Sequence, residues 1–236
     1  MGKMNYNLEG KVFVVTGGSR GIGLELARQL LEQQARVAIC GRKEEGLQAA
    51  AADLNAGDNL LCVQAHVARA KEVDNLFQQV VDRFGNIDGL INNVGMNIAT
   101  GLVDADPGLW NKIVDSNLNG TFLCSRKAGQ IMRDQGGGKI VSVAARGGLE
   151  GRAKMGPYAA SKSAVIRLTE TLAAELQGQG VNVNCVLPGT IDTPPNREAM
   201  PQADFSKWVA PAALADVILF LASDAARAVT GAAVPA

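Results

Sequence analysis

The stretch VFVVTGGSRGIG, residues 12–23, places a short apolar run directly before a glycine-rich turn, and a helical pattern follows it. The apolar run predicts a buried strand. The glycines let the backbone bend sharply and approach a ligand closely. A helix that begins at such a turn presents free N–H groups and a positive dipole end, which suit a pyrophosphate. This order of elements predicts a dinucleotide site, and the alternative is a tight structural turn.

The same alternation of strand and helix continues along the chain. Helical patterns cover residues 71–84 and a segment that begins near Tyr158 and ends at Gly178 and Gly180. Such alternation indicates βαβ units with right-handed crossovers. The expected fold class is α/β, with a single Rossmann-like doubly wound parallel sheet flanked by helices on both faces, in one domain over residues 1–236. The expected strands are Val12–Thr16, Arg36–Cys40, Leu60–Gln64, Gly89–Asn92, Lys139–Val143 and Val181–Val186.

The composition excludes several classes of function. Lys plus Arg and Asp plus Glu both number 23, so no basic excess favours nucleic acid or an anionic membrane surface. No apolar run is long enough to span a bilayer, and the first residues lack the apolar core of a signal peptide. Four cysteines without short paired spacing and one histidine predict neither disulfides nor a metal site. We therefore expect a cytoplasmic protein that acts on a small molecule.

Tyr158 and Lys162 form the candidate acid–base pair. They are four residues apart, so on a helix they share one face. A free phenol has a pKa of about 10, too high for efficient proton transfer at neutral pH. A nearby ammonium group favours the phenolate and is expected to lower that pKa.

Five segments in order resemble the short-chain dehydrogenase/reductase family. They are Thr16–Gly23, Asn92–Gly95, Asn117, Tyr158–Lys162 with the pattern Tyr-x-x-x-Lys, and Pro188–Thr193. The resemblance implies catalytic roles for Tyr158, Lys162 and Asn117, the last holding a water that links the lysine to solvent. It also implies assembly as a homodimer or homotetramer, although the chain ends within the expected last strand. The implied cofactor-binding residues are Gly17, Ser19, Arg20, Gly21, Ile22, Gly23, Arg42, His66, Val67, Asn93, Gly95, Tyr158, Lys162, Pro188, Gly189, Ile191 and Thr193.

The end of the second expected strand favours NADP(H) over NAD(H). Gly41 stands where NAD-preferring relatives carry an aspartate for the ribose hydroxyls. Arg42, Lys43 and Arg20 can instead reach a 2′-phosphate, and arginine suits a bidentate contact. The alternative is that Arg42 and Lys43 only begin a solvated helix.

His66 replaces the aspartate that accepts a hydrogen bond from adenine in this family. A neutral imidazole can accept one hydrogen bond, so adenine binding can survive the change. The alternative is a partly exposed histidine with no special role.

Ala145 stands where the family carries its catalytic serine, thirteen residues before the tyrosine. A methyl group cannot hydrogen-bond a developing oxyanion, and losing one such donor costs about 10²–10³ in rate. Ser142 lies on the opposite face of the expected strand and cannot substitute. Three explanations stay open: an already activated substrate, a replacement donor such as Arg146 or a lid residue, or cofactor binding without useful turnover.

The Pro-rich segment 190–208 is an expected substrate lid, the alternative being a plain surface connection. Residues 187–208 resemble dihydropteridine reductases, which also carry alanine at the serine position. The expected substrate contacts are Ala145, Arg146, Asn196 and Arg197. The alternative is that Arg197 pairs with Asp204 while Phe205 and Trp208 pack the lid down.

The expected activity is NADP(H)-dependent transfer of hydride to a small carbonyl compound or to an activated, quinonoid or imine-like substrate. The alternatives are a dihydropteridine-reductase-like enzyme, a 3-oxoacyl thioester reductase, and a cofactor-binding sensor with little catalysis.

Overall fold

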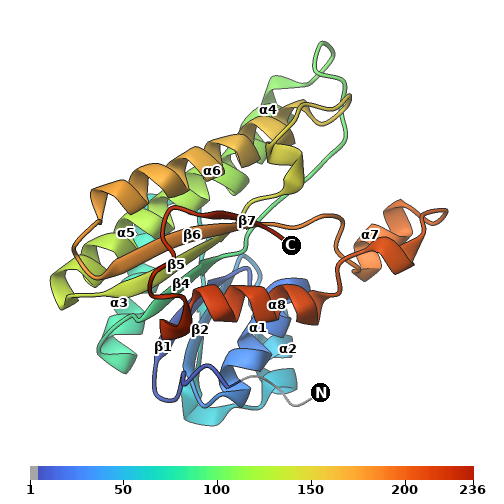
Figure 1. Ribbon diagram of the computed structural model, residues 1–236. Coiled ribbons are helices and arrows are strands. Elements are labelled where there is room, and N and C mark those ends of the chain that lie inside the picture. The colour runs from blue at the N-terminus through green and yellow to red at the C-terminus, as the bar shows by residue number, and fades with distance from the viewer. Residues whose placement is uncertain (1–4) are drawn as a thin grey trace.

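A single seven-stranded sheet forms the centre of the computed structural model, which describes residues 5–236 (Figure 1). Every neighbouring pair of strands is parallel, in the order β3-β2-β1-β4-β5-β6-β7. The order reverses between β1 and β4, which opens a crevice at their carboxyl ends. The strands are β1 Val12–Thr16, β2 Arg36–Gly41, β3 Leu60–Gln64, β4 Gly89–Asn92, β5 Gly138–Val143, β6 Val181–Leu187 and β7 Ala233–Pro235.

Helices cover both faces of the sheet (Figure 1). Apolar side chains of α1, α2 and α8 pack on one face, and those of α3, α5 and α6 pack on the other. The α-helices are α1 Gly21–Glu32, α2 Glu44–Leu54, α3 Ala70–Phe84, α4 Pro107–Val114, α5 Gly120–Gln135, α6 Gly156–Glu175, α7 Pro194–Ala199 and α8 Pro211–Leu221.

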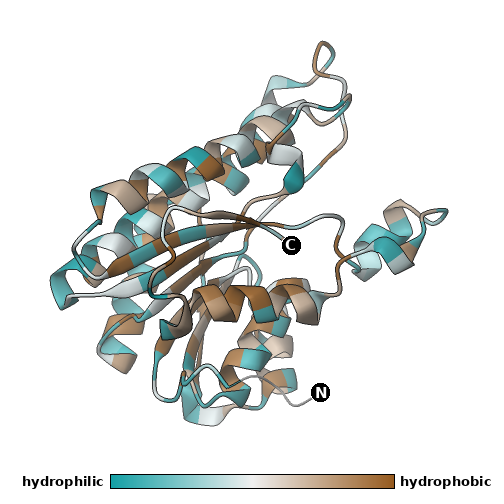
Figure 2. Cartoon of the chain, viewed as in Figure 1, coloured by the Kyte–Doolittle hydropathy of each residue, from teal (hydrophilic) through white to brown (hydrophobic). Residues whose placement is uncertain are grey.

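Alternation of side chains along β1 explains why two helical layers are needed. Phe13 and Val15 belong to the core on one face, while Val12 and Val14 belong to the core on the other. All are buried, as expected for a strand covered on both sides. In Figure 2 the strands are mostly hydrophobic, and most of the helices carry both hydrophobic and hydrophilic residues.

The predicted fold class is confirmed, and each of the six strands predicted by residue range agrees with the structure to within one residue. The seventh strand, β7, is three residues long. The expected lid contains α7 and a 3₁₀ turn at Phe205–Lys207, and Ile191 and Val209 form a parallel bridge at its base. Within the described residues, no helix combines the length and apolar character needed to cross a membrane.

Candidate active site

The carboxyl ends of β1, β2, β4, β5 and β6 open into one cleft with two halves. The cofactor half, about 700 Å³, is bounded by Gly17, Arg42 and His66. The substrate half, about 610 Å³, is bounded by Ala145, Met155 and Tyr158. The halves adjoin because they share the wall residues Ile22, Asn93, Gly95, Met96, Asn97, Ile191 and Asn196.

The glycine-rich turn after β1 packs too tightly for side chains. Gly17 has a φ of +66°, and a Cβ at Gly23 would lie 2.3 Å from the Gly17 carbonyl oxygen. Gly21 has a φ of +55°, and a Cβ there would meet nothing within 4 Å, so its open side faces the cleft. Asn93 fixes the turn, since its Nδ2 donates to the carbonyls of Thr16 (3.0 Å) and Gly17 (3.3 Å).

The start of α1 provides donors for an anion. The backbone N–H of Leu24 donates to the Arg20 carbonyl at 3.3 Å. The N–H groups of residues 21–23 have no acceptor among the described residues, and no side chain caps the helix. These donors and the positive end of the helix dipole fit a pyrophosphate.

The far end of the cofactor half carries positive charge, and no carboxylate of the described residues lines it. Arg20 and Arg42 are exposed, line this half and form no ion pair with another described residue. A Cβ at Gly41 would lie 3.3 Å from Ser19 Oγ, so the end of β2 and the glycine-rich turn are in close contact. Lys43, by contrast, lines neither half of the cleft. The arrangement fits a 2′-phosphate held by two guanidinium groups.

The environment of His66 differs from the predicted one. The backbone N–H of Ala68 donates to His66 Nδ1 at 3.2 Å, so Nδ1 carries no proton. A neutral ring then carries its proton on Nε2, which can only donate. The expected acceptance of a hydrogen bond from adenine does not fit this tautomer. His66 still lines the cofactor half, beside Val67.

Tyr158 and Lys162 project from α6 into the substrate half. Lys162 is buried, and its Nζ donates to the Val143 carbonyl at 2.6 Å. Nζ lies 5.9 Å from the centroid of the Tyr158 ring. Burial lowers the pKa of Lys162 to about 8. Burial also raises the pKa of Tyr158, so the expected lowering of the phenol pKa by the lysine is not seen here.

Asn117 lies behind this pair, in a π-helical turn between α4 and α5. Its Oδ1 accepts from the Met96 N–H at 2.6 Å, and its Nδ2 donates to the Met96 carbonyl and to Ser161 Oγ, both at 2.9 Å. Ser161 Oγ in turn donates to the Tyr158 carbonyl at 2.8 Å. The buried amide therefore ties the loop after β4 to α6. The role of Ser161 was not predicted; its signal is a polar residue on the inner face of that helix.

Ala145 lies in the wall of the substrate half and offers it only a methyl group. Ser142 is buried, accepts a hydrogen bond from Asn92 Nδ2 at 3.1 Å, and lines neither half of the cleft. Ser142 therefore does not supply the hydroxyl group that Ala145 lacks. Arg146 also lines the substrate half; its Nη2 lies 3.4 Å from the Ala236 oxygen.

The lid separates two predicted substrate contacts. Asn196 lines both halves of the cleft, whereas Arg197 lines neither. Arg197 donates twice to Asp192, at 2.5 and 2.7 Å, and lies 4.8 Å from the Phe205 ring centroid. The suggested Arg197–Asp204 pair is wrong, because Asp204 caps the 3₁₀ turn and pairs with Lys207. Phe205 and Trp208 pack against each other, with ring centroids 4.7 Å apart.

Of the predicted cofactor residues, all but Gly23 line the cleft, and Gly23 lies beneath it as a packing residue. Sequence reasoning missed Met96, Asn97, Arg152 and Met155 in the wall of the substrate half. These residues follow β4 or precede α6 in irregular loops, where no periodicity marks a binding surface.

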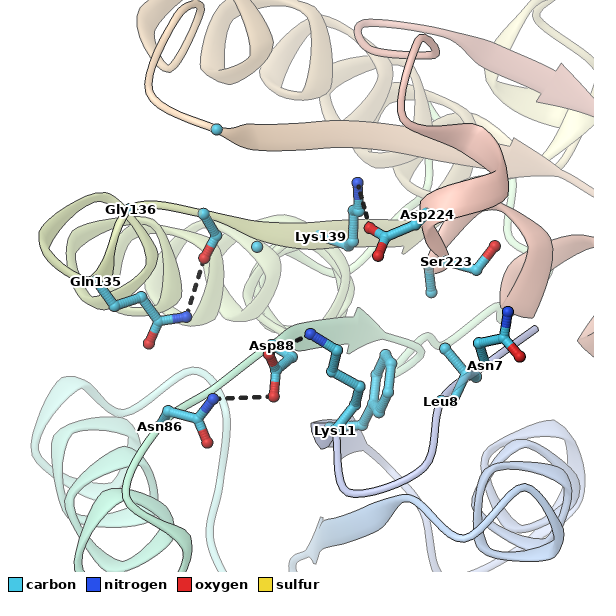
Figure 3. A pocket seen from close by; sticks show the side chains of 15 residues that line it. Asn7, Leu8, Lys11, Asn86, Asp88, Gln135, Gly136, Lys139, Ser223 and Asp224 are labelled. Carbon is cyan, nitrogen blue, oxygen red and sulfur yellow. Dashed lines mark hydrogen bonds and ion pairs between the residues drawn. The ribbon is translucent and has the colours of Figure 1, made fainter.

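Another cavity, about 360 Å³, opens at the opposite edge of the sheet (Figure 3). It lies at the amino ends of β1, β4 and β5. Its charged groups pair with each other, Lys11 with Asp88 at 3.4 Å and Lys139 with Asp224 at 3.6 Å. Because its charges are already paired and it holds no acid–base pair, this cavity is not a candidate active site.

Known proteins share both the sequence pattern and the fold. Residues 11–204 match the family model for short chain dehydrogenases. A 3-oxoacyl-[acyl-carrier-protein] reductase of Synechocystis sp. is 37% identical, over 95% of this chain and 94% of the relative. A 2-(S)-hydroxypropyl-CoM dehydrogenase of Xanthobacter autotrophicus is 34% identical, over 98% and 96%.

Two solved structures give the same result. The crystal structure of gox2181 has a TM-score of 0.92 and 33% identity, covering 98% of this chain and 95% of that one. A short chain dehydrogenase from Bacillus anthracis has a TM-score of 0.89 and 30% identity, covering 97% and 95%.

Proposed function

Because the chain belongs to the short-chain dehydrogenase family and is an oxidoreductase, we propose that it uses NADPH to reduce a small carbonyl compound. The observation that carries the proposal is the placement of Tyr158 and Lys162 in a cavity that adjoins the glycine-rich turn. The acid and the cofactor cradle therefore share one cleft, as hydride transfer coupled to protonation requires.

The residues of the cofactor half fit a phosphorylated dinucleotide. The turn at Gly17–Gly23 and the start of α1 would hold the pyrophosphate. Arg20 and Arg42 would hold the 2′-phosphate, which supports NADP(H) over NAD(H). Thr193, at the lid end of this half, would hold the nicotinamide carboxamide. When bound, the nicotinamide supplies a hydride, that is two electrons and one proton, to the substrate carbon.

Tyr158 would complete the reduction from the substrate half. Its hydroxyl donates a proton to the substrate oxygen as the C=O π bond breaks, so one C–H and one O–H bond form. The raised pKa keeps the phenol protonated near neutral pH, as an acid must be before it donates. Lys162 stabilises the resulting phenolate with its ammonium group, and solvent returns the proton to Tyr158.

Two substrate classes are supported by different observations. The relatives named above are a 3-oxoacyl-[acyl-carrier-protein] reductase and a 2-(S)-hydroxypropyl-CoM dehydrogenase, which favours a carbonyl compound joined to a carrier. Ala145 and the dihydropteridine-reductase-like lid favour an activated ring, because a quinonoid or imine-like group needs less polarisation than a ketone. We place the 3-oxoacyl thioester first, because the relatives cover nearly the whole chain.

A substrate panel tests this proposal. NADPH oxidation is measured with a simple ketone, a 3-oxoacyl thioester, a quinone and a quinonoid dihydropterin, in the parent and in Ala145→Ser. Turnover of the thioester supports the first class. Turnover confined to the activated rings, with ketone activity gained in Ala145→Ser, supports the second. NADPH binding without turnover of any of the four contradicts the proposal.

Assembly and location follow from the same proposal. We propose a homodimer or homotetramer, as the family resemblance implies, and a location in the cytoplasm, where it acts on a small molecule. Sedimentation of the purified protein distinguishes these two assemblies from a monomer.

A further inference from the structure

The side-chain amide of Asn196 lies where the two halves of the cleft meet, and Ala145 lies in the same cavity wall. We propose that Asn196 Nδ2 donates to the reacting oxygen of the substrate the hydrogen bond that Ala145 cannot give. This inference rests on the proposed carbonyl reduction and assigns a catalytic residue to it. The polarising donor would thus come from the lid instead of from β5.

The amide has a free donor to give. An asparagine NH₂ group carries two N–H bonds. One of them points to the Ile191 carbonyl, with a distance of 2.8 Å between Nδ2 and the oxygen. The other N–H has no acceptor among the described residues, and Asn196 is only half-buried in the cleft wall. A substrate oxygen at the junction of the halves can therefore accept it.

The lid holds this amide in place before any substrate arrives. Asn196 lies in the first turn of α7, where its N–H donates to Thr193 Oγ1 at 3.4 Å. The Arg197 side chain donates two hydrogen bonds to the Asp192 carboxylate. This ion pair, called the Asp192–Arg197 clasp below, spans the first turn of α7. The base of the lid is tied to the body through the Asp192 N–H, which donates to the Val209 carbonyl at 2.9 Å. A donor fixed in this way needs no reorganisation during the reaction.

Other polar groups near Ala145 are less suited to the role. Arg146 is exposed, and its Nη2 donates to the Ala236 oxygen at 3.4 Å. Asn97 also lines both halves, but it is exposed and its Nδ2 donates to Met155 Sδ at 3.8 Å. Ser142 is buried outside the cleft. Asn196 is thus the half-buried amide with a spare N–H at the junction.

The test is a rescue experiment with paired substitutions. Asn196→Asp keeps the shape of the side chain and removes the donor, and Asn196→Ala removes the whole amide. We expect either change to lower kcat/KM for the carbonyl substrate by at least about 30-fold. In an Ala145→Ser background the serine hydroxyl donates the hydrogen bond to the substrate oxygen instead. The same substitutions at Asn196 should then lower kcat/KM by less than about threefold.

Asn111→Asp is the matched control, because Asn111 is an exposed amide on α4 outside the cleft. It makes the same chemical change and should leave kcat/KM unaltered. Thermal unfolding and NADPH binding, followed by cofactor fluorescence, verify that each variant is folded and loaded.

A second readout does not depend on turnover. Isobutyramide is a carbonyl compound that cannot readily be reduced, and its binding to the NADPH complex is followed by the same fluorescence. We expect Asn196→Asp to weaken this binding by about tenfold, and Ala145→Ser to restore it.

Equal losses in the parent and Ala145→Ser backgrounds, or no loss in either, would overturn the inference while the proposed reduction stands. A parent protein that binds NADPH but neither reduces a carbonyl nor binds isobutyramide overturns the proposed function together with the inference. The two failures are therefore distinguishable.

Discussion

Lys162 Nζ donates a 2.6 Å hydrogen bond to the backbone carbonyl of Val143, at the end of β5. The bond joins α6 to the strand that precedes Ala145. It fixes a buried ammonium group beside Tyr158, and burial of that group lowers its pKa to about 8 from 10.5. Burial of this charge lowers the stability of the folded state, and the proposed proton transfer requires the charge.

Replacing Lys162 by methionine should stabilise the fold and abolish activity. A lysine whose pKa is depressed on folding binds its proton more weakly in the folded than in the unfolded state. The penalty is complete below about pH 8 and disappears as the pH rises from about 8 to 10.5. At pH 7 we expect Lys162→Met to raise the free energy of unfolding by on the order of 2 kcal/mol, after the loss of the bond to Val143.

Urea unfolding at pH 7 and pH 10 measures this effect. The advantage of Lys162→Met should shrink at pH 10, where the parent lysine is neutral in the folded state. An advantage of the same size at both pH values would show that packing, and not the buried charge, is responsible.

The glycine-rich turn should tolerate alanine at one glycine and reject it at another. A Cβ at Gly23 would lie 2.3 Å from the Gly17 carbonyl oxygen, whereas one at Gly21 meets nothing within 4 Å. We expect Gly23→Ala to lower the free energy of unfolding by about 1–3 kcal/mol and to weaken NADPH binding at least about tenfold. Gly21→Ala should cost only about 1 kcal/mol from its positive φ.

Chemical denaturation and fluorescence titration of NADPH compare the two variants. Both substitutions add the same methyl group to the same turn, but only Gly21→Ala carries a cost from a positive φ and only Gly23→Ala produces a clash. Equal effects at the two positions would contradict the packing described here.

Arg42 should decide between the two nicotinamide cofactors. It lines the cofactor half without a carboxylate partner among the described residues. Arg42→Asp places a negative charge against the 2′-phosphate, so we expect the kcat/KM ratio of NADPH to NADH to fall at least about 100-fold. Lys43→Asp is the matched control, since Lys43 lines neither half of the cleft.

Initial rates with each cofactor at two salt concentrations make this measurement. The parent preference for NADPH should weaken as salt screens the arginines. If Lys43→Asp changes the ratio as much as Arg42→Asp does, the 2′-phosphate site is misplaced.

The Asp192–Arg197 clasp should affect substrate use more than cofactor binding. Arg197 touches Asp192 and the Phe205 ring but does not line the cleft. Asp192→Asn removes the charge and half of the clasp, which loosens the turn that holds Asn196. We expect kcat/KM for the carbonyl to fall by about tenfold while the Kd for NADPH changes by less than about twofold.

The control is the ion pair between Arg152 and Glu150, which lines the substrate half. Glu150→Gln breaks an exposed ion pair that does not hold α7. A larger loss from Glu150→Gln than from Asp192→Asn would mean that this ion pair, and not the lid, positions the substrate.

Much of the fold was predictable because buried parallel strands are short, continuous apolar runs. The strand at Val12–Thr16 and the glycine-rich turn after it were both placed correctly from sequence. The strand at Ala233–Pro235 was expected only from the family resemblance, since three residues with a terminal proline carry no periodic signal. The Tyr158–Lys162 pair was predictable because a spacing of four residues fixes a common face.

Other features depended on contacts between distant or competing groups. The sequence allows Arg197 to form an ion pair with Asp192 or with Asp204. The turn of α7 brings it to Asp192. The tautomer of His66 is set by the N–H of Ala68, which depends on the local turn. Burial of Tyr158 raises its pKa against the expected effect of Lys162, because the balance depends on how deeply the pair is enclosed.

The most direct test of the central claim is a single-turnover measurement of NADPH absorbance. Protein preloaded with NADPH is mixed with acetoacetyl thioester, in the parent and in Tyr158→Phe, and cofactor binding is measured separately in both. The parent should oxidise its bound NADPH, whereas Tyr158→Phe should bind NADPH equally well and lose at least about 10² in rate. Oxidation at the parental rate in Tyr158→Phe would contradict the account, because the proton would then come from another group.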